Sequence, residues 1–428
     1  MKILTFSPYI YVDGKQYSKN VTGFGYMAAF TAESLSALGH EVGVYTHSYF
    51  TSEKKTDSFF FVSHSKRDII RAFFNINNIK RCYKYSRVAR KNPNKLKKRL
   101  KTIYYFISIG HLEKTIKKHK PDIAHIQSIG EGTIPFMVSC INQGIPFVIT
   151  LHGLVLKMGA SYHHINLEKL LIESATNKSI SISTVSEGVK RDAVNIYDTD
   201  GSTITSVANG NRVLVPKYDA RKLKERLGIP NEDKVILCVG TLGERKNQRM
   251  VIQFVKMAKE RGIDNITAVF VGADSTNGEL QNYTSDIGIL EKVKFMGVIP
   301  HMDLGDYYNI SDITILLSYG EGFPGSLIES ALFGKPIVCF SDLSGSEEFD
   351  DTNSVKIQVH NLEDVYAGVI KALNNNWDYE LIKERAKIFS LENMAKNYIE
   401  LFERVIEQRC ELTEGELYII WKDSFENS

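Results

Sequence analysis

Short apolar runs alternate with helical patterns along almost the whole chain, and this alternation predicts parallel β-sheets covered by helices on both faces. In the first half, strands are expected at residues 3–6, 41–45, 123–126, 146–150, 181–185 and 202–207. A helical pattern over residues 25–38 follows the first of these strands and ends at Gly39, a residue type that is common just beyond a helix. The chain therefore opens with the form strand, loop, helix, strand.

The same alternation begins afresh after a charged, helix-prone linker at residues 219–227. Its strands are expected at residues 235–239, 267–271, 293–296, 313–317 and 336–340. These runs are almost continuously apolar, which is typical of sheets buried on both faces. We therefore predict an N-terminal domain of residues 1–210 and a C-terminal domain of residues 211–393, with a last segment, residues 394–428, that packs back on the first domain.

Composition agrees with two domains. The chain has 428 residues, of which 43% are hydrophobic, so it can build two cores of about 150 to 200 residues each. It has no uncharged apolar stretch of the ~18 residues that span a membrane, and the apolar run before Ser7 is too short for a secretory signal. Five widely spaced cysteines suggest neither a disulfide framework nor a Cys-x-x-Cys metal site. A cytoplasmic protein is expected.

The net charge of +3 hides a strongly basic segment between residues 80 and 120. Its only acidic residue is Glu113, and its cations are Lys80, Arg81, Lys84, Arg87, Arg90, Lys91, Lys95, Lys97, Lys98, Arg99, Lys101, Lys114, Lys117, Lys118 and Lys120. Aromatic residues lie in and beside it, so we favour peripheral docking on the anionic inner face of the cell membrane. A set of solvated helix faces stays open, whereas nucleic acid is not expected because no recognised binding module accompanies the charge.

The sharpest chemical signal follows the strand predicted at residues 313–317. It begins Glu321-Gly322-Phe323-Pro324-Gly325-Ser326 and continues through Glu329. A helix that starts near Gly325 would direct N–H groups and a positive dipole end at an anion such as a diphosphate. Glu321 and Glu329 could then accept hydrogen bonds from the hydroxyls of a sugar and a ribose. The alternative is a capping box between Ser326 and Glu329, with Glu321 merely solvated.

A second candidate loop, Val239-Gly240-Thr241-Leu242-Gly243-Glu244-Arg245-Lys246-Asn247, follows the first strand of the second domain. Cations placed there can reach a diphosphate at the carboxyl edge of a parallel sheet. Lys246 and Arg245 are the candidates, although both could be ordinary solvated cations.

Two further candidates lie in the first half. Gly23, Phe24 and Gly25 stand between the first strand and the first helix, where glycines are also common as simple loop residues. His152 comes just beyond a predicted strand, at the edge where open α/β sheets bind ligands. A structural role for His152 stays open.

These segments resemble the family 4 retaining glycosyltransferases of the GT-B fold, also called glycosyl transferases group 1. Glu321 and Glu329 match the family's Glu-x7-Glu signature, whose first Glu contacts the donor sugar and whose second contacts the ribose. Lys246 occupies the place of its phosphate-binding lysine, and His152 matches its Thr-x-His segment, whose histidine approaches the donor sugar.

Weaker matches extend the resemblance to about residue 405. Thr241 stands where the family often has arginine, so Arg245 is expected to supply the second positive charge. The segment Gly23, Phe24 and Gly25 resembles the loop that shapes the acceptor site, and Gly297 with Val298 resembles the loop that brackets the base. The resemblance implies two Rossmann-like doubly wound α/β domains facing across a cleft.

The implied function is metal-independent, retaining hexosyl transfer from a UDP- or GDP-linked sugar, with no other cofactor. The acceptor is expected to be a saccharide, lipid-linked in envelope polysaccharide or glycoconjugate synthesis, and the expected catalytic residues are His152, Lys246 and Glu321. A nucleotide-sugar 2-epimerase and a non-catalytic partner subunit of a glycosylation complex remain open.

Two short patterns are interpreted as non-functional. Asp198-Thr199-Asp200 has the spacing of a metal-binding Asp-x-Asp but lies in a polar stretch away from the candidate site, so we expect a plain loop. The pair His163-His164 is expected at the surface.

Overall fold

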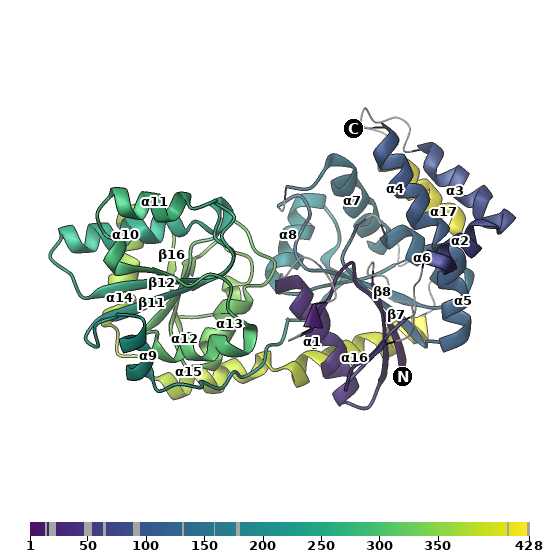
Figure 1. Cartoon of the computed structure of the whole chain (residues 1–428). Helices are drawn as coiled ribbons and strands as arrows, with labels where there is room; N and C mark the ends of the chain where they lie inside the picture. Colours follow the sequence, from purple (N-terminus) through teal and green to yellow (C-terminus); the bar gives the residue numbers. More distant parts are fainter. Residues whose placement is uncertain are drawn as a thin grey trace. The chain divides into compact units, whose positions relative to one another are not determined.

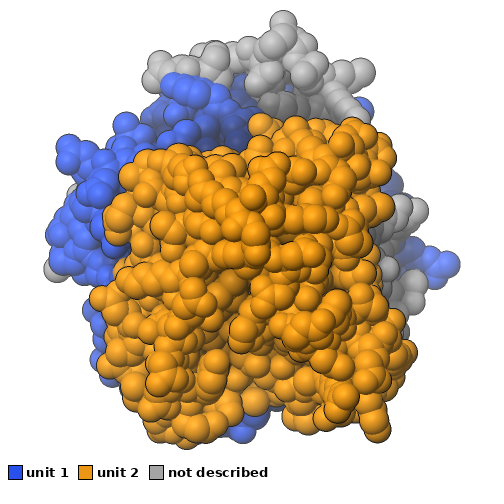
Figure 2. Space-filling view, turned by 90° about the vertical axis from the view of Figure 1, so that its left-hand side faces the viewer, with its two compact units in different colours: residues 1–209, 391–428 blue, residues 210–390 orange. Residues whose placement is uncertain are grey.

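The computed structural model describes residues 1–12, 15–16, 23–46, 54–62, 66–88, 95–130, 132–157, 159–176, 180–408 and 411–425. Its internal contacts divide the chain into two compact units, drawn in different colours in Figure 2. Unit 1 comprises Met1–Asn209 and Leu391–Ser428, and unit 2 comprises Gly210–Ser390. The last helical segment therefore belongs to unit 1, although it follows unit 2 along the chain.

Unit 1 is built on an eight-stranded sheet (Figure 1). In spatial order its strands are β10 (Ile204–Ser206), β9 (Ser181–Thr184), β8 (Phe147–Leu151), β7 (Ile123–Gln127), β1 (Lys2–Phe6), β4 (Glu41–Tyr45), β6 (Phe60–Phe61) and β5 (Lys54–Lys55). The strands pair in parallel except β5, which is antiparallel to β6. The order reverses between β1 and β7, and ligands of open α/β sheets bind at such a switch point.

Helices cover both faces of this sheet because its strands carry apolar side chains on both. On one face, α1 (Gly23–Ala37) and α16 (Leu391–Gln408) pack together over residues such as Ile3, Val42 and Val148. On the other face, Phe136 of α6 (Thr133–Asn142) stacks on Phe6 with ring centroids 5.0 Å apart. Two further helices, α7 (Tyr162–Thr176) and α8 (Glu187–Tyr197), complete the α/β part of unit 1.

A helical subdomain extends this unit and was not anticipated as a packed structure. It contains α2 (Lys66–Phe73), α3 (Ile76–Val88), α4 (Lys95–Ile107), α5 (Ile109–His119) and the C-terminal helix α17 (Glu414–Asp423). Trp421 of α17 is buried, and its indole N–H donates to the carbonyl oxygen of Tyr85 at 3.2 Å. Arg81 pairs with Glu113 and with Glu414, each at 3.1 Å. One cation of the basic segment therefore stabilises the fold.

His163 does not lie at the surface, where the sequence had led us to expect it, because it packs against residues around α17. This side chain is buried, is hydrogen-bonded through Nδ1 to Ser424 Oγ at 2.9 Å, and stacks on Phe425. It lies in the packing between α7 and the residues around α17 and is not a surface residue.

Unit 2 has a six-stranded parallel sheet. Its spatial order is β13 (Val293–Phe295), β12 (Ile266–Val271), β11 (Lys234–Val239), β14 (Ile313–Leu316), β15 (Ile337–Phe340) and β16 (Ser354–Ile357). Numbered along the chain this is the order 3-2-1-4-5-6 of a dinucleotide-binding Rossmann fold. Its helices are α9 (Ala220–Arg226), α10 (Gln248–Glu260), α11 (Glu279–Asp286), α12 (Leu304–Ile310), α13 (Gly325–Leu332), α14 (Leu362–Asn374) and α15 (Tyr379–Ala386).

The segment interpreted as a linker at residues 219–227 is part of unit 2. Asp219 caps α9 by accepting hydrogen bonds from the N–H groups of Arg221 and Lys222. Leu223 of this helix is buried in the core that also contains Val235 and Tyr308. The helix predicted here is confirmed, but the segment packs on unit 2 and does not link two domains; one buried leucine in a short charged helix leaves little apolar pattern from which to predict that packing.

Candidate functional site

The two predicted cation and carboxylate loops of unit 2 meet at the switch point of its sheet. The loop after β11 carries Arg245 and Lys246, and the loop after β14 carries Glu321. Lys246 Nζ lies 2.8 Å from Glu321 Oε1, and Arg245 Nη1 lies 2.7 Å from the same oxygen. The structure therefore brings these three predicted residues into direct contact.

Backbone geometry explains why the Lys246 side chain can lie where it does. Gly240 directly follows β11 and has φ +148°, and a Cβ at this position would lie 3.2 Å from Lys246 Cε. Only glycine leaves this space open at such a φ. The loop is held from below by the buried Gln248, which accepts from the Gly243 N–H at 3.1 Å and donates to the Thr241 carbonyl at 3.2 Å.

Glu321 is ionised in this setting. Burial raises the pKa of its carboxyl group, but the charges of Lys246 and Arg245 and a hydrogen bond from Ser318 outweigh burial, so the pKa is lowered overall. The Lys246 and Glu321 side chains are 14% and 11% exposed, whereas that of Arg245 is 50% exposed. Arg245 is thus the cation that solvent reaches more easily, and Lys246 is the one held against the sheet.

Helix α13 begins at Gly325, as the sequence predicts, directly after Pro324. Two of the backbone N–H groups in its first turn, which we expected to bind an anion, are already hydrogen-bonded. The Gly325 N–H donates to the Phe323 carbonyl and the Leu327 N–H to the Pro324 carbonyl, each at 2.9 Å. A Cβ on Gly345 would lie 2.4 Å from Pro324 Cδ, so the next loop packs tightly beneath the start of the helix.

Glu329 is the centre of a buried hydrogen-bond network. Its Oε1 accepts from Asn211 Nδ2 and is bonded to His301 Nε2, each at 2.8 Å, and its Oε2 accepts from the Tyr308 hydroxyl at 2.6 Å. The residue is 6% exposed. A capping box with Ser326 does not form, since α13 has no side-chain cap. Polar groups of the protein thus already hydrogen-bond both carboxylate oxygens of Glu329.

The predicted base-bracketing residues follow β13. Gly297 has φ +66° and accepts from the Gly272 N–H at 2.8 Å, and Val298 is 62% exposed. This loop leads to His301 and so reaches the Glu329 network. His301, Asn211 and Tyr308 are site residues that the sequence pattern missed, and no spacing signal marks them.

In unit 1, His152 and Phe24 come together. Their ring centroids are 4.8 Å apart in an edge-on arrangement, and Phe24 also contacts Tyr9. The glycine-rich loop expected at this place is instead the first turn of α1, which begins at Gly23 and includes Phe24 and Gly25. Residues 21 and 22, which complete that motif, lie outside the described residues.

Buried polar side chains extend inward from His152 along the same face of the sheet. His125 Nε2 lies 2.7 Å from Thr150 Oγ1, which lies 2.7 Å from Ser183 Oγ. Burial lowers the pKa of His152 to about 4, and burial followed by the nearness of His152 lowers the pKa of His125 to about 3. Both imidazoles are therefore neutral near pH 7.

Within the described ranges, no group of three or more His, Cys, Asp or Glu side chains is arranged to hold a metal ion. Asp198 ends α8 in the left-handed conformation, and Asp200 caps the following turn by accepting from the Ser202 N–H. The Asp-x-Asp pattern is accounted for by these two helix-end positions.

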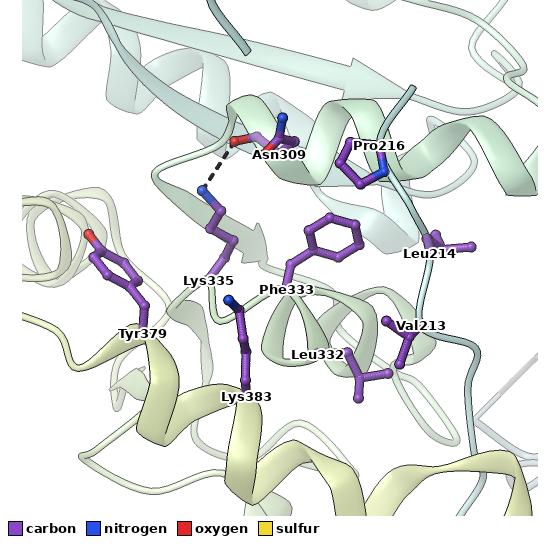
Figure 3. Close-up of a pocket in the computed structure, with 9 residues that line it drawn as sticks. All are labelled: Val213, Leu214, Pro216, Asn309, Leu332, Phe333, Lys335, Tyr379 and Lys383. Carbon is purple, nitrogen blue, oxygen red and sulfur yellow. Dashed lines mark hydrogen bonds between the residues drawn. The ribbon is translucent and has the colours of Figure 1, made fainter. Parts of the chain in front are cut away.

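A pocket of about 540 Å³ lies elsewhere in unit 2 (Figure 3). It is lined by Val213, Leu214, Pro216, Asn309, Leu332, Phe333, Lys335, Tyr379 and Lys383. Lys335 donates to the Asn309 carbonyl at 3.2 Å, and burial lowers the pKa of its amine. The pocket adjoins the carboxyl end of α13, whereas the candidate site adjoins the amino end, and it contains none of the predicted site residues.

Both units match models of known families. Residues 21–211 match Glycosyltransferase Family 4, and residues 219–389 match Glycosyl transferases group 1. These two segments take up most of the chain and fall in unit 1 and in unit 2 almost entirely. The chain belongs to the family 4, group 1 glycosyltransferases.

Curated relatives agree with this assignment. An uncharacterized glycosyltransferase of Methanocaldococcus jannaschii is 24% identical over 246 residues, which are 54% of this chain and 62% of the relative. A D-inositol 3-phosphate glycosyltransferase of Corynebacterium kroppenstedtii is 26% identical over 236 residues, which are 51% and 52% of the two chains. The chain thus spans between half and two thirds of the length of these relatives.

Solved structures show the same fold. Sucrose-phosphate synthase from Thermosynechococcus elongatus matches with a TM-score of 0.70 and 15% identity, over 95% of this chain and 99% of the other. HepE of Anabaena, solved in complex with UDP-glucose, matches with a TM-score of 0.68 and 15% identity, over 94% and 100%. The fold is GT-B, with two Rossmann-like α/β units.

Proposed function

We propose that this protein is a retaining glycosyltransferase that uses a nucleotide diphosphate sugar. The observation that carries the proposal is the cluster of Lys246, Arg245 and Glu321 at the switch point of unit 2, next to the start of α13. Family membership and the UDP-glucose in the similarly folded HepE support a UDP- or GDP-linked donor.

The cluster suits the charge that develops in this reaction. When the bond between the anomeric carbon and the diphosphate breaks, its electron pair leaves with the diphosphate, whose growing negative charge Lys246 and Arg245 can stabilise. In the structure both cations pair with Glu321. A bound diphosphate would also pair with Lys246 and Arg245, so these cations would bind Glu321 less tightly. The ionised Glu321 could then accept hydrogen bonds from sugar hydroxyls. These charges lie in the protein itself, and we propose that no metal is needed.

Retention follows from the expected geometry of the reaction in this family. The acceptor oxygen would bond to the anomeric carbon on the face that the diphosphate leaves, and its proton would pass to the departing phosphate oxygen. His152 would line the sugar as a neutral group, because burial keeps its pKa near 4. A neutral imidazole can donate or accept one hydrogen bond without adding charge.

The stereochemistry of the product tests this proposal. The purified protein is incubated with UDP-glucose or GDP-mannose, both α-linked, and with octyl glycosides as acceptors, and the anomeric proton of the product is followed by NMR. An α-linked product supports retention. A β-linked product contradicts it, and an epimerised nucleotide sugar formed without acceptor would indicate an epimerase instead.

A matched pair of variants links the reaction to the cluster. Glu321→Gln should lower transfer about 100-fold, the order expected for losing one preorganised polar group at a reacting centre. The control is Glu363→Gln on α14, which weakens only an exposed ion pair with Arg261 and should leave transfer unchanged. Equal activity of both variants would show that Glu321 does not contribute to the reaction.

We further propose that the helical subdomain docks on an anionic membrane, which would bring a lipid-linked saccharide acceptor within reach. Helices α2, α3 and α4, with the turn between α2 and α3, expose a concentration of large apolar side chains: Ile70, Phe74, Ile76, Ile79, Tyr83 and Leu100. Ile70 is 57% exposed and Ile76 is 68% exposed. Exposed cations, including Arg71, Lys80, Lys84 and Arg87, accompany them. Apolar side chains flanked by cations suit the boundary between headgroups and acyl chains.

No helix among the described residues is long and apolar enough to cross a bilayer. Sedimentation with phosphatidylglycerol-containing vesicles at low salt tests binding through the exposed side chains of α2, α3 and α4. The double variant Ile70→Ser, Ile76→Ser should release the protein, whereas Leu290→Ser, the same chemical change at an exposed site of unit 2, should not. Unchanged sedimentation of the double variant would contradict docking through these helices.

A further inference from the structure

Gln127 is the last residue of β7, at the point where the strand order of unit 1 reverses. In the parallel registers His125 pairs with Thr5 of β1 and with Val148 of β8, and Gln127 pairs with Thr150. Side chains alternate along a strand, so Gln127 lies on the same sheet face as His125. That face is covered by α1 and α16, and Tyr398 and Phe402 of α16 contact the His125 ring. Gln127 thus lies at the ligand-binding edge, on the side of α1.

The Gln127 side chain is buried without hydrogen bonds. The residue is 0% exposed, and neither Nε2 nor Oε1 has a hydrogen-bond partner among the described residues. A buried amide without partners costs free energy, and most such groups in native proteins are paired. An amide that has no partner among the described residues, at the switch point of a sheet, points to a group of a bound ligand as its partner.

The surroundings define the chemistry of that partner. His152 follows the neighbouring strand β8, and its Nε2 is also buried and without a hydrogen-bond partner among the described residues. Its pKa near 4 makes this imidazole neutral, and the Phe24 ring packs against it. A neutral amide, a neutral imidazole and an aromatic ring suit a sugar ring with uncharged hydroxyl or acetamido groups, rather than a phosphate.

We infer that Gln127 is a specificity-determining residue that binds a neutral hydroxyl or acetamido group of the saccharide acceptor, with its Nε2 donating and its Oε1 accepting. The inference rests on the proposed glycosyl transfer. It assigns Gln127 to the acceptor because Gln127 belongs to unit 1 together with Gly23, Phe24 and Gly25, whose resemblance implies an acceptor role, whereas the donor's diphosphate is assigned to Lys246 and Arg245 of unit 2.

Stability measurements test the unpaired state without any substrate. Gln127→Met keeps the length of the side chain and removes both polar atoms, so the melting temperature should stay the same or rise. Thr150→Val is the matched control on the next strand, because Thr150 Oγ1 lies within hydrogen-bond distance of His125 and of Ser183, and its melting temperature should fall. A fall for Gln127→Met as large as that for Thr150→Val would show that the amide has partners inside the protein, and would overturn the inference.

Transfer measurements test what the amide binds. With octyl glucoside, octyl galactoside and octyl N-acetylglucosaminide as acceptors, Gln127→Met should raise the acceptor KM at least tenfold and leave the Kd for UDP within twofold of the wild-type value. Wild-type acceptor kinetics in the variant would overturn the inference, and so would a loss of UDP affinity equal to the loss of transfer. If the wild-type protein transfers no sugar, the proposed function fails, and the melting temperatures still decide whether Gln127 is an unpaired amide.

Discussion

Removal of the Glu329 carboxylate should destabilise unit 2 strongly, because this group binds three buried polar side chains. Glu329→Ala removes from Asn211, His301 and Tyr308 the partner they have at 2.6 to 2.8 Å, and leaves the Tyr308 hydroxyl with the Ser326 carbonyl at 3.1 Å and Asn211 Nδ2 with the Gly325 carbonyl at 3.4 Å. Each unpaired buried polar group costs about 1–3 kcal/mol. The three belong to one network and partly relax together, so we expect a total loss of about 3–5 kcal/mol in the free energy of unfolding.

The two tryptophans allow the units to be followed separately. Trp377 is buried in unit 2 and Trp421 in unit 1, so in a Trp421→Phe background tryptophan fluorescence during urea unfolding reports on unit 2. In this background Glu363→Ala is the control, because its ion pair with Arg261 is exposed to solvent, and it should cost less than about 1 kcal/mol. A loss below about 1 kcal/mol for Glu329→Ala, or a loss equal to that of the control, would refute the network as a structural element.

Three further predictions concern unit 1. Burial raises the pKa of Glu168 to about 7, so the folded state binds this proton more tightly than the unfolded state does. The stability that the proton confers is present below about pH 4.5 and is lost as the pH rises to about 7. Glu168→Gln should therefore remove a decline of about 3 kcal/mol over this window, measured as the difference between wild-type and variant unfolding free energies; parallel curves would contradict it. His152 stays neutral, so it should contribute no inflection near pH 6.5 to the pH profile of kcat/KM, and an inflection that disappears in His152→Gln would show that the pKa of His152 is not lowered. Trp421→Ala should cost about 3–5 kcal/mol, seen as a lower melting temperature, because it empties the packing around Tyr85 and Phe106; a change below about 1 kcal/mol would show that α17 is not part of the core.

The sheets could be predicted from the sequence because their strands are continuous apolar runs with turn residues at both ends. The eleven strands expected all lie on a strand of the structure, with ends shifted by one or two residues. The two-residue strands β5 and β6 were missed because they carry too few residues to show a period. The four-residue β16 was missed because Ser354 and Lys356 alternate with its two apolar residues and weaken its apolar pattern.

The candidate site could be predicted only in part. Lys246, Arg245 and Glu321 lie in loops with recognisable spacing, and their contacts depend on strand order, which places β11 beside β14. Asn211 and His301 reach Glu329 from segments that lie 118 and 28 residues away along the chain, so no local pattern reveals them. Unpaired Gln127 could not be predicted either, because only coordinates show that a buried amide lacks a partner.

The most direct test of the account is calorimetric binding of UDP and GDP to the wild-type protein and to two lysine variants. Lys246→Met removes the cation held against Glu321, and Lys383→Met removes a cation of the separate pocket in the same unit. We predict that one of the two nucleotides binds, that Lys246→Met weakens binding at least tenfold, which is about 1.4 kcal/mol, and that Lys383→Met binds as the wild type does. Failure of both nucleotides to bind, or equal affinity of Lys246→Met and the wild type, would contradict the central claim that a nucleotide diphosphate is held at the start of α13.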